Sequence, residues 1–136
     1  KMAEASIVAG VAFSHPRTTA SHACSFPLTN IYGLPHGEAW AFTLDYFLKF
    51  NAERADGDGR ITALAKDCGF NDAFEMADEI TAMKKRMGMR CTLSEIGCET
   101  DEQIDELTKK SMSMLMTRNP ITLTQKDIKE MYIKLK

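Results

Sequence analysis

Residues 21–39 read SHACSFPLTNIYGLPHGEA, and the fold prediction starts from this segment. His22 lies within a predicted helix, and a Gly-Leu-Pro turn at residues 33–35 leads to His36 at the start of the next helix. A tight turn of this kind could return the second imidazole to the face of the first. The segment therefore predicts two consecutive helices that each carry one histidine.

Helical patterns extend from this segment in both directions along the chain. The predicted helices span Met2–Ser14, 17–26, 38–53, 61–66, 71–87 and 101–117, with a last helix that begins near Thr124. The first carries apolar side chains around most of its circumference, so we expect it to be buried at the centre of the domain. Pro27 is expected to limit the second helix, because a proline inside a helix removes a hydrogen bond.

The starts of the later helices carry suitable capping residues. Asn71, Thr100 and Thr124 stand where N-caps are expected, and Asp127 is a first-turn acid of the last helix. No segment shows the alternation of a strand, and no glycine-rich turn follows a strand. The sequence therefore predicts a single all-α domain over residues 1–136, a helical bundle. Such a chain cannot by itself contain a dinucleotide-binding fold built on a parallel sheet.

Composition excludes several classes of partner. The 136-residue chain is 44% hydrophobic and carries a formal charge of −2, with lysines and acids intermixed, which gives no reason to expect nucleic acid or a membrane surface as a partner. No run approaches the ~18 apolar residues of a membrane span, and no signal-peptide pattern is seen, so a cytoplasmic location is expected. The cysteines form no CxxC pair and are expected to be reduced thiols; they are Cys24, Cys68, Cys91 and Cys98.

His22 and His36 are the candidates for metal binding. Neutral imidazoles are good ligands for a divalent first-row ion, but such an ion usually takes three or four protein ligands. Their spacing alone leaves a second interpretation open, in which the two histidines are core residues or helix caps. The surrounding residues are needed to choose between these interpretations.

The residues around both histidines resemble the hallmark region of the iron-containing (group III) alcohol dehydrogenases. The resemblance covers residues 1–50 best and rests on segments 5–14, 21–23, 27–28 and 32–39. It implies the C-terminal helical domain of the dehydroquinate synthase-like fold. It also implies that His22 and His36 are ligands of a divalent metal, with iron preferred and zinc possible. The implied reaction is hydride transfer between NAD(P) and a small alcohol or aldehyde.

The same resemblance implies what this sequence lacks. Family members complete the metal site with an aspartate and a histidine on an upstream helix, and they hold NAD(P) in an N-terminal domain. Neither feature occurs in the 136 residues, so we expect a fragment that is inactive alone and contributes no catalytic residue beyond its ligands. Exposed surface is expected to favour a homo-oligomer. The alternative function is a non-enzymatic helical scaffold or dimerisation module.

Three further residues are candidates for the substrate or cofactor pocket. Phe13 stands where family members place an aromatic residue near the substrate, although a core role is the alternative. Phe26 stands where many members carry another histidine, so the pocket is expected to be more apolar there. Arg17 could bind an anionic substrate group through forked hydrogen bonds, or could simply be exposed at a helix start. Segments 17–22 and 26–29 are most similar to a subgroup that includes phosphonoacetaldehyde reductases.

Other polar and methionine-rich segments have structural explanations. The Asp-Gly-Asp-Gly of residues 56–59 copies the centre of a calcium loop, but Arg54 and Ala65 replace two of the carboxylates that calcium requires, so a polar connector is expected. The basic run at residues 84–86 is expected to be a solvated face. The methionines within 112–116 alternate, so only part of them can point inward from a helix.

Overall fold

The structure is a computed structural model that describes residues 1–136, and its regular elements are all helical. The elements are α1 (Met2–Ser14), α2 (Ala20–Tyr32), α3 (His36–Ala41), α4 (Leu44–Ala55), α5 (Arg60–Asp67), α6 (Ala73–Arg86), η1 (Ser94–Ile96), α7 (Asp101–Ser111), η2 (Met114–Arg118) and α8 (Gln125–Lys134). The prediction of an all-α domain is confirmed. None of these helices combines the length and the apolar character that a membrane span requires.

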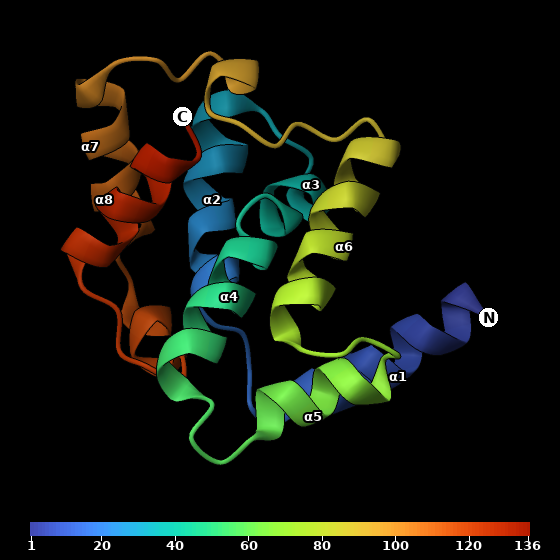
Figure 1. Ribbon diagram of the computed structural model, residues 1–136. Helices are drawn as coiled ribbons and strands as arrows, with labels where there is room; N and C mark the ends of the chain where they lie inside the picture. Colours follow the sequence, from blue (N-terminus) through green and yellow to red (C-terminus); the bar gives the residue numbers. More distant parts are fainter.

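Helix α2 forms the centre of the bundle. It packs against α3, α7 and η2, and Figure 1 shows it between the α7–α8 pair and the group formed by α3, α4 and α6. Small side chains on its buried face, including Ala20, Ala23 and Cys24, allow the neighbouring helices to approach closely. Leu28 is fully buried on the same helix, and burial of a leucine side chain contributes about 1.5–3 kcal/mol. The helix that carries His22 is therefore fixed by the core.

The end of α2 differs from the sequence prediction. Pro27 lies inside the helix, which continues to Tyr32 instead of ending near Phe26. Proline removes one backbone hydrogen bond, but Pro27 is itself buried beside Leu28, and this burial offsets the loss. The helix begins at Ala20 and not at Arg17, which lies in the connection from α1.

The helix predicted over residues 38–53 is also divided. Phe42 and Thr43 separate α3 from α4, and both side chains are buried. Thr43 has φ −110° and ψ 3°, which is outside the helical range and turns the chain between the two helices. The break lets α4 pack along α6, the neighbour with which it shares its most extensive contact.

A buried ion pair joins α4 to α6 and corrects the prediction for residues 84–86. Lys84 is buried and not solvated, and its Nζ lies 2.7 Å from Asp45 Oδ1 and 3.3 Å from the carbonyl oxygen of Phe42. The Thr81 hydroxyl donates to the second oxygen of Asp45. Lys85 and Arg86, by contrast, are exposed as expected.

Two of the three predicted N-caps are confirmed, and the third N-cap is the next residue along the chain. Thr100 and Thr124 each form a capping box with the residue three positions later, so both predictions are confirmed. At α6 the cap is Asp72 and not Asn71, because the Asp72 carboxylate accepts from two N–H groups of the first turn. The connector before α5 is similar, since Asp56 accepts from the Ile61 and Thr62 N–H groups.

Residues 101–117 do not form one continuous helix. α7 ends at Ser111, and Met112 adopts an extended conformation before the short helix η2. Met116 is buried while Met114 is exposed, so only part of the methionines points inward, as predicted. All four cysteines are free, and burial raises the pKa of the Cys24 thiol to about 12.

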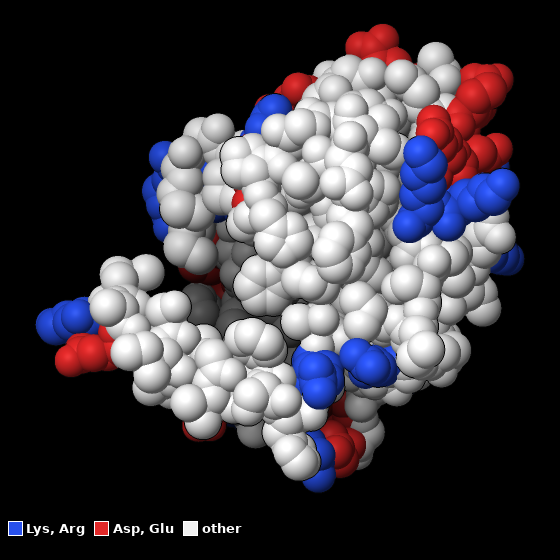
Figure 2. Space-filling model, turned by 180° about the vertical axis from the view of Figure 1, so that it is seen from behind, with Lys and Arg blue, Asp and Glu red and all other residues white.

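The position predicted for α1 is wrong. None of its residues is buried, and Ile7, Val8 and Val11 are each about 70% exposed. Apolar side chains around the whole circumference suit a buried helix, but no layer of this chain covers α1. Figure 2 shows the N-terminal arm projecting from the body of the molecule, with a hollow between them.

Candidate metal and substrate site

His22 and His36 lie next to each other. Their ring centroids are 5.1 Å apart, and the ring planes are nearly perpendicular at 89°. α2 ends at Gly33, whose φ of 68° lies in the left-handed region that glycine adopts without a penalty. Leu34 is buried after this turn, and Pro35 is the N-cap from which α3 begins at His36. The turn at residues 33–35 thus returns the second imidazole to the first.

The surroundings of His22 favour its neutral form. The ring is half-buried, and burial first, followed by the neighbouring His36, lowers its pKa below the usual value. Neutral imidazole is the form that binds a metal ion. His36 is exposed and opens onto the same space.

Together the two imidazoles fit part of a metal site. A first-row divalent ion accepts imidazole nitrogen readily, and the two rings are adjacent. The structure contains no cluster of three or more His, Cys, Asp or Glu side chains that could hold a metal. The two imidazoles are therefore fewer donors than a complete metal site requires.

A clamp on α3 holds His36 in place. Glu38 accepts from Arg90 at both carboxylate oxygens, with Nε and Nη2 each 2.8 Å away, and it also accepts from the Arg90 backbone N–H at 2.9 Å. The side-chain hydrogen bonds from Arg90 lower the pKa of Glu38. Since Glu38 follows His36 by two residues, this forked contact fixes the first turn of α3 against the segment after α6.

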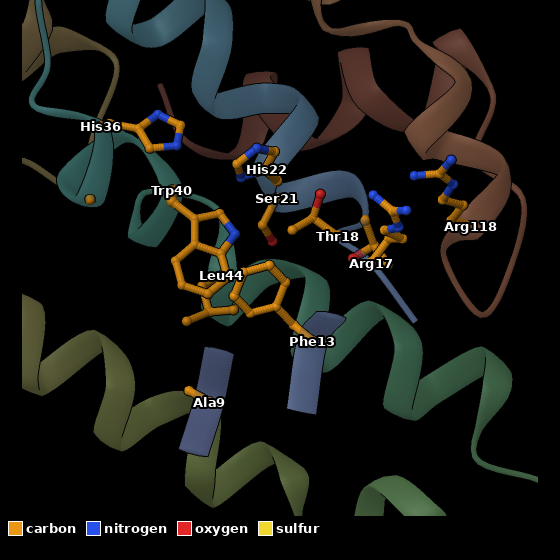
Figure 3. A pocket seen from close by; sticks show the side chains of 12 residues that line it. Ala9, Phe13, Arg17, Thr18, Ser21, His22, His36, Trp40, Leu44 and Arg118 are labelled. Atoms are coloured by element: carbon orange, nitrogen blue, oxygen red, sulfur yellow. The ribbon is translucent and has the colours of Figure 1, made fainter. Parts of the chain in front are cut away.

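The two histidines lie in the wall of a pocket of about 620 Å³. The residues that line it come from α1, α2, α3, α4, η2 and the connection before α2; they are Ala9, Phe13, Arg17, Thr18, Thr19, Ser21, His22, His36, Gly37, Trp40, Leu44 and Arg118. Figure 3 shows Phe13, Trp40 and Leu44 on one side of this space and both arginines on another. The pocket thus combines an apolar wall, hydroxyl groups and basic side chains.

Four of the five candidate site residues line this pocket: Phe13, Arg17, His22 and His36. Phe26 is not among the lining residues. Its ring instead meets His22 edge to face at a centroid distance of 4.8 Å, and the His36 ring at 6.0 Å. It is partly exposed beside the histidine pair and presents no proton donor to it.

Sequence reasoning missed several lining residues. Trp40 follows His36 by four positions in the same helical segment, and that spacing places two side chains on one helix face, so the pattern could have revealed it. Arg118 has no local signal, because it reaches the pocket only through the packing of η2 against α2. Thr18 and Thr19 were missed because the predicted helix began at residue 17, whereas α2 begins at Ala20 and leaves both threonines in the connection before it.

Comparisons with known proteins identify the family of this chain. Residues 1–135 match the C-terminal region of the Fe-containing alcohol dehydrogenase family. The chain is 30% identical to an alcohol dehydrogenase of Thermococcus barophilus over 94% of its length, and 31% identical to 1-propanol dehydrogenase PduQ of Salmonella typhimurium over 85%. These alignments cover 34% and 32% of the two relatives, so the chain spans about a third of their length.

Two solved structures share the fold. A sulfoacetaldehyde reductase from Bifidobacterium kashiwanohense in complex with NAD+ is 47% identical, with a TM-score of 0.92 over 98% of this chain and 35% of the other. An iron-containing alcohol dehydrogenase from Thermococcus thioreducens is 28% identical, with a TM-score of 0.77 over 93% of this chain and 34% of the other. The match extends over nearly every helix described above.

Proposed function

Because this chain belongs to the Fe-containing alcohol dehydrogenase family, we propose that it supplies two metal ligands and part of the substrate pocket to an NAD(P)-dependent alcohol dehydrogenase or aldehyde reductase. The proposed ligands are His22 and His36. Their adjacent rings in the wall of a pocket are the observation that carries the proposal. The substrate is a small aldehyde or the corresponding alcohol, which the similarity to a protein named a sulfoacetaldehyde reductase supports. That name also agrees with the subgroup resemblance, since sulfonate and phosphonate groups are both negatively charged at neutral pH.

Groups outside residues 1–136 complete the site in this proposal. An all-α chain has no parallel sheet to hold a dinucleotide, so the NAD(P) site belongs to another part of the enzyme. The remaining metal ligands come from there as well, because two imidazoles alone do not satisfy a divalent ion. The isolated chain is accordingly expected to reduce no aldehyde.

Each residue of the site has a chemical task. A bound divalent metal, iron by preference and zinc as the alternative, would polarise the substrate oxygen and lower the cost of its negative charge. His22 and His36 would hold that metal through neutral nitrogens. Phe13 and Trp40 give one side of the pocket an aromatic surface on which the carbon chain of a substrate would pack. Phe26 supports the His22 ring by edge contact and cannot relay a proton.

Titration of the chain with Co²⁺, followed by NMR, tests the ligands directly. The paramagnetic ion should broaden the imidazole signals of His22 and His36 first, with the Trp40 indole signal next. His22→Ala and His36→Ala should each abolish this selective broadening. His15→Ala is the matched control, because His15 is the third histidine, is exposed and does not line the pocket.

The contrary result has a clear meaning. If His22→Ala and His36→Ala retain the broadening pattern of the unchanged chain, the two histidines are packing residues. The non-enzymatic scaffold would then replace the metal-binding domain as the preferred function.

A further inference from the structure

The two arginines of the pocket differ from the other arginines of the chain. Four of the six arginines form an ion pair with an acid; these are Arg54, Arg60, Arg86 and Arg90. Arg17 and Arg118 have no acidic partner in the structure, although both line the same pocket. Both side chains are exposed to solvent, and both border the same cavity, so their two positive charges can act together on a negatively charged group that enters it.

The rest of the pocket wall carries no negative charge that would oppose an anion. No Asp or Glu side chain lines it, in a chain that has 19 acids against 17 Lys and Arg residues. Thr18, Thr19 and Ser21 add hydroxyl groups that can donate to an oxyanion. In Figure 2, basic side chains stand near the inner end of the N-terminal arm, where most of the surrounding atoms are uncharged. The pocket is therefore electropositive within a weakly acidic protein.

The backbone also directs Arg17 and α2 toward this space. Arg17 has φ 69° and is the sole residue other than glycine with a positive φ, a conformation that L side chains rarely adopt. Its N–H donates to the Phe13 carbonyl at 2.9 Å just after α1. Its side chain borders the pocket and lies near that of Arg118 (Figure 3). Thr19, the N-cap of α2, makes no side-chain capping bond, which leaves the positive end of that helix open at the pocket wall.

We propose that Arg17 and Arg118 form an oxyanion subsite that holds the acidic end of the substrate while His22 and His36 face its oxygen-bearing carbon. The substrate class is then a small aldehyde or alcohol with a sulfonate, phosphonate or carboxylate group. This inference rests on the proposed function, because it makes the same pocket the substrate site. Arg118 becomes a specificity-determining residue that lies far from the histidines in sequence.

Trp40 provides the measurement, since it is the chain's only tryptophan and lines the pocket. The probes are isethionate (2-hydroxyethanesulfonate), 2-hydroxyethylphosphonate and 3-hydroxypropionate, with 1-propanol as the neutral analogue of similar size. The anions should change Trp40 fluorescence saturably, and 1-propanol at the same concentration should not. Arg17→Gln and Arg118→Gln should each weaken isethionate binding about 10- to 100-fold, the loss expected for charge-assisted hydrogen bonds.

Two further variants refine the test. Arg118→Lys should retain part of the affinity, because lysine keeps the charge but not the planar fork. Arg60→Gln is the matched control, since Arg60 pairs with Asp58 away from the pocket and its loss should leave isethionate binding unchanged. Circular dichroism checks that each variant remains folded. Equal binding of 1-propanol and isethionate, or unchanged affinity in both glutamine variants, would overturn the subsite.

The Co²⁺ titration separates this inference from the proposed function. The glutamine variants should still show broadening at His22 and His36, because neither arginine is a proposed ligand. Anion binding that persists where Co²⁺ binding is absent from the unchanged chain would overturn the metal proposal alone. Displacement of isethionate by NAD+ would assign the arginines to the cofactor phosphates and overturn the substrate subsite.

Discussion

Asp45 and Lys84 show how one pair of charged residues can fix the geometry of this domain. The Lys84 side chain is 3% exposed and that of Asp45 is 12% exposed. Both charges are removed from water, which is costly unless every polar atom finds a partner. The partners are present: Asp45 accepts from Lys84 and Thr81, and Lys84 also donates to the Phe42 carbonyl at the break between α3 and α4. The pair therefore stabilises the junction that positions α3.

Lys84→Ala should lower the free energy of unfolding by about 3–5 kcal/mol, because it leaves the Asp45 carboxylate buried without its cation. Urea denaturation followed by circular dichroism measures the loss. Lys85→Ala is the matched control, since Lys85 is the next residue and is exposed, and it should change stability by no more than about 0.5 kcal/mol. Equal effects of the two substitutions would show that the buried pair does not stabilise the fold.

The burial of Lys84 also marks a limit of sequence reasoning at this scale. A run of basic residues near a helix end predicts a solvated face, and for Lys85 and Arg86 that prediction is right. Lys84 differs because its partner Asp45 stands 39 positions earlier, on another helix. The clamp between Arg90 and Glu38 spans 52 positions and was missed for the same reason. Local patterns contain no information about such tertiary pairs.

At the scale of helices, the sequence predicted which segments are helical better than where they end. Local capping motifs are visible in sequence, and Thr100 and Thr124 are caps in the structure. The continuation of α2 through Pro27 and the break at Phe42 and Thr43 depend on burial against other helices, which overrides local preference. The histidine pair was foreseeable because its turn is local, whereas the contribution of η2 to the pocket was not.

Gly33 provides a test of how α2 ends. A Cβ at this position would meet no atom within 4 Å, so the cost of Gly33→Ala is conformational and not steric. The left-handed backbone should make it destabilising by about 1–2 kcal/mol, and Gly33→Asn should cost less. Thermal denaturation can rank the two variants.

Gly10→Ala is the control for Gly33, because a Cβ there also meets nothing within 4 Å but the residue lies inside α1 without a positive φ. Alanine favours a helix interior over glycine by roughly 0.5–1 kcal/mol, so this variant should lose no stability. If Gly33→Ala were equally harmless, the left-handed turn would not be needed to return His36 to His22.

At the scale of the whole molecule, α1 is the feature that the remaining helices leave uncovered. Figure 1 shows it at the edge of the bundle behind α5, and it contributes only Ala9 and Phe13 to the pocket. Its exposed apolar residues lie in consecutive turns, in contrast to the singly exposed Leu64 of α5. A contiguous apolar surface of this kind favours association, whereas scattered apolar residues are ordinary on protein surfaces.

We therefore expect the chain to self-associate through α1 as its concentration rises. Sedimentation velocity over a range of concentrations should show a growing fraction of oligomer, and the double substitution Ile7→Lys with Val11→Lys should shift the chain toward monomer by placing charge on the apolar surface. Leu64→Lys is the matched control, because Leu64 is 52% exposed but isolated, and it should leave the distribution unchanged. A chain that stays monomeric at every concentration would show that α1 makes no contact between copies, and the expected homo-oligomer would then need another surface.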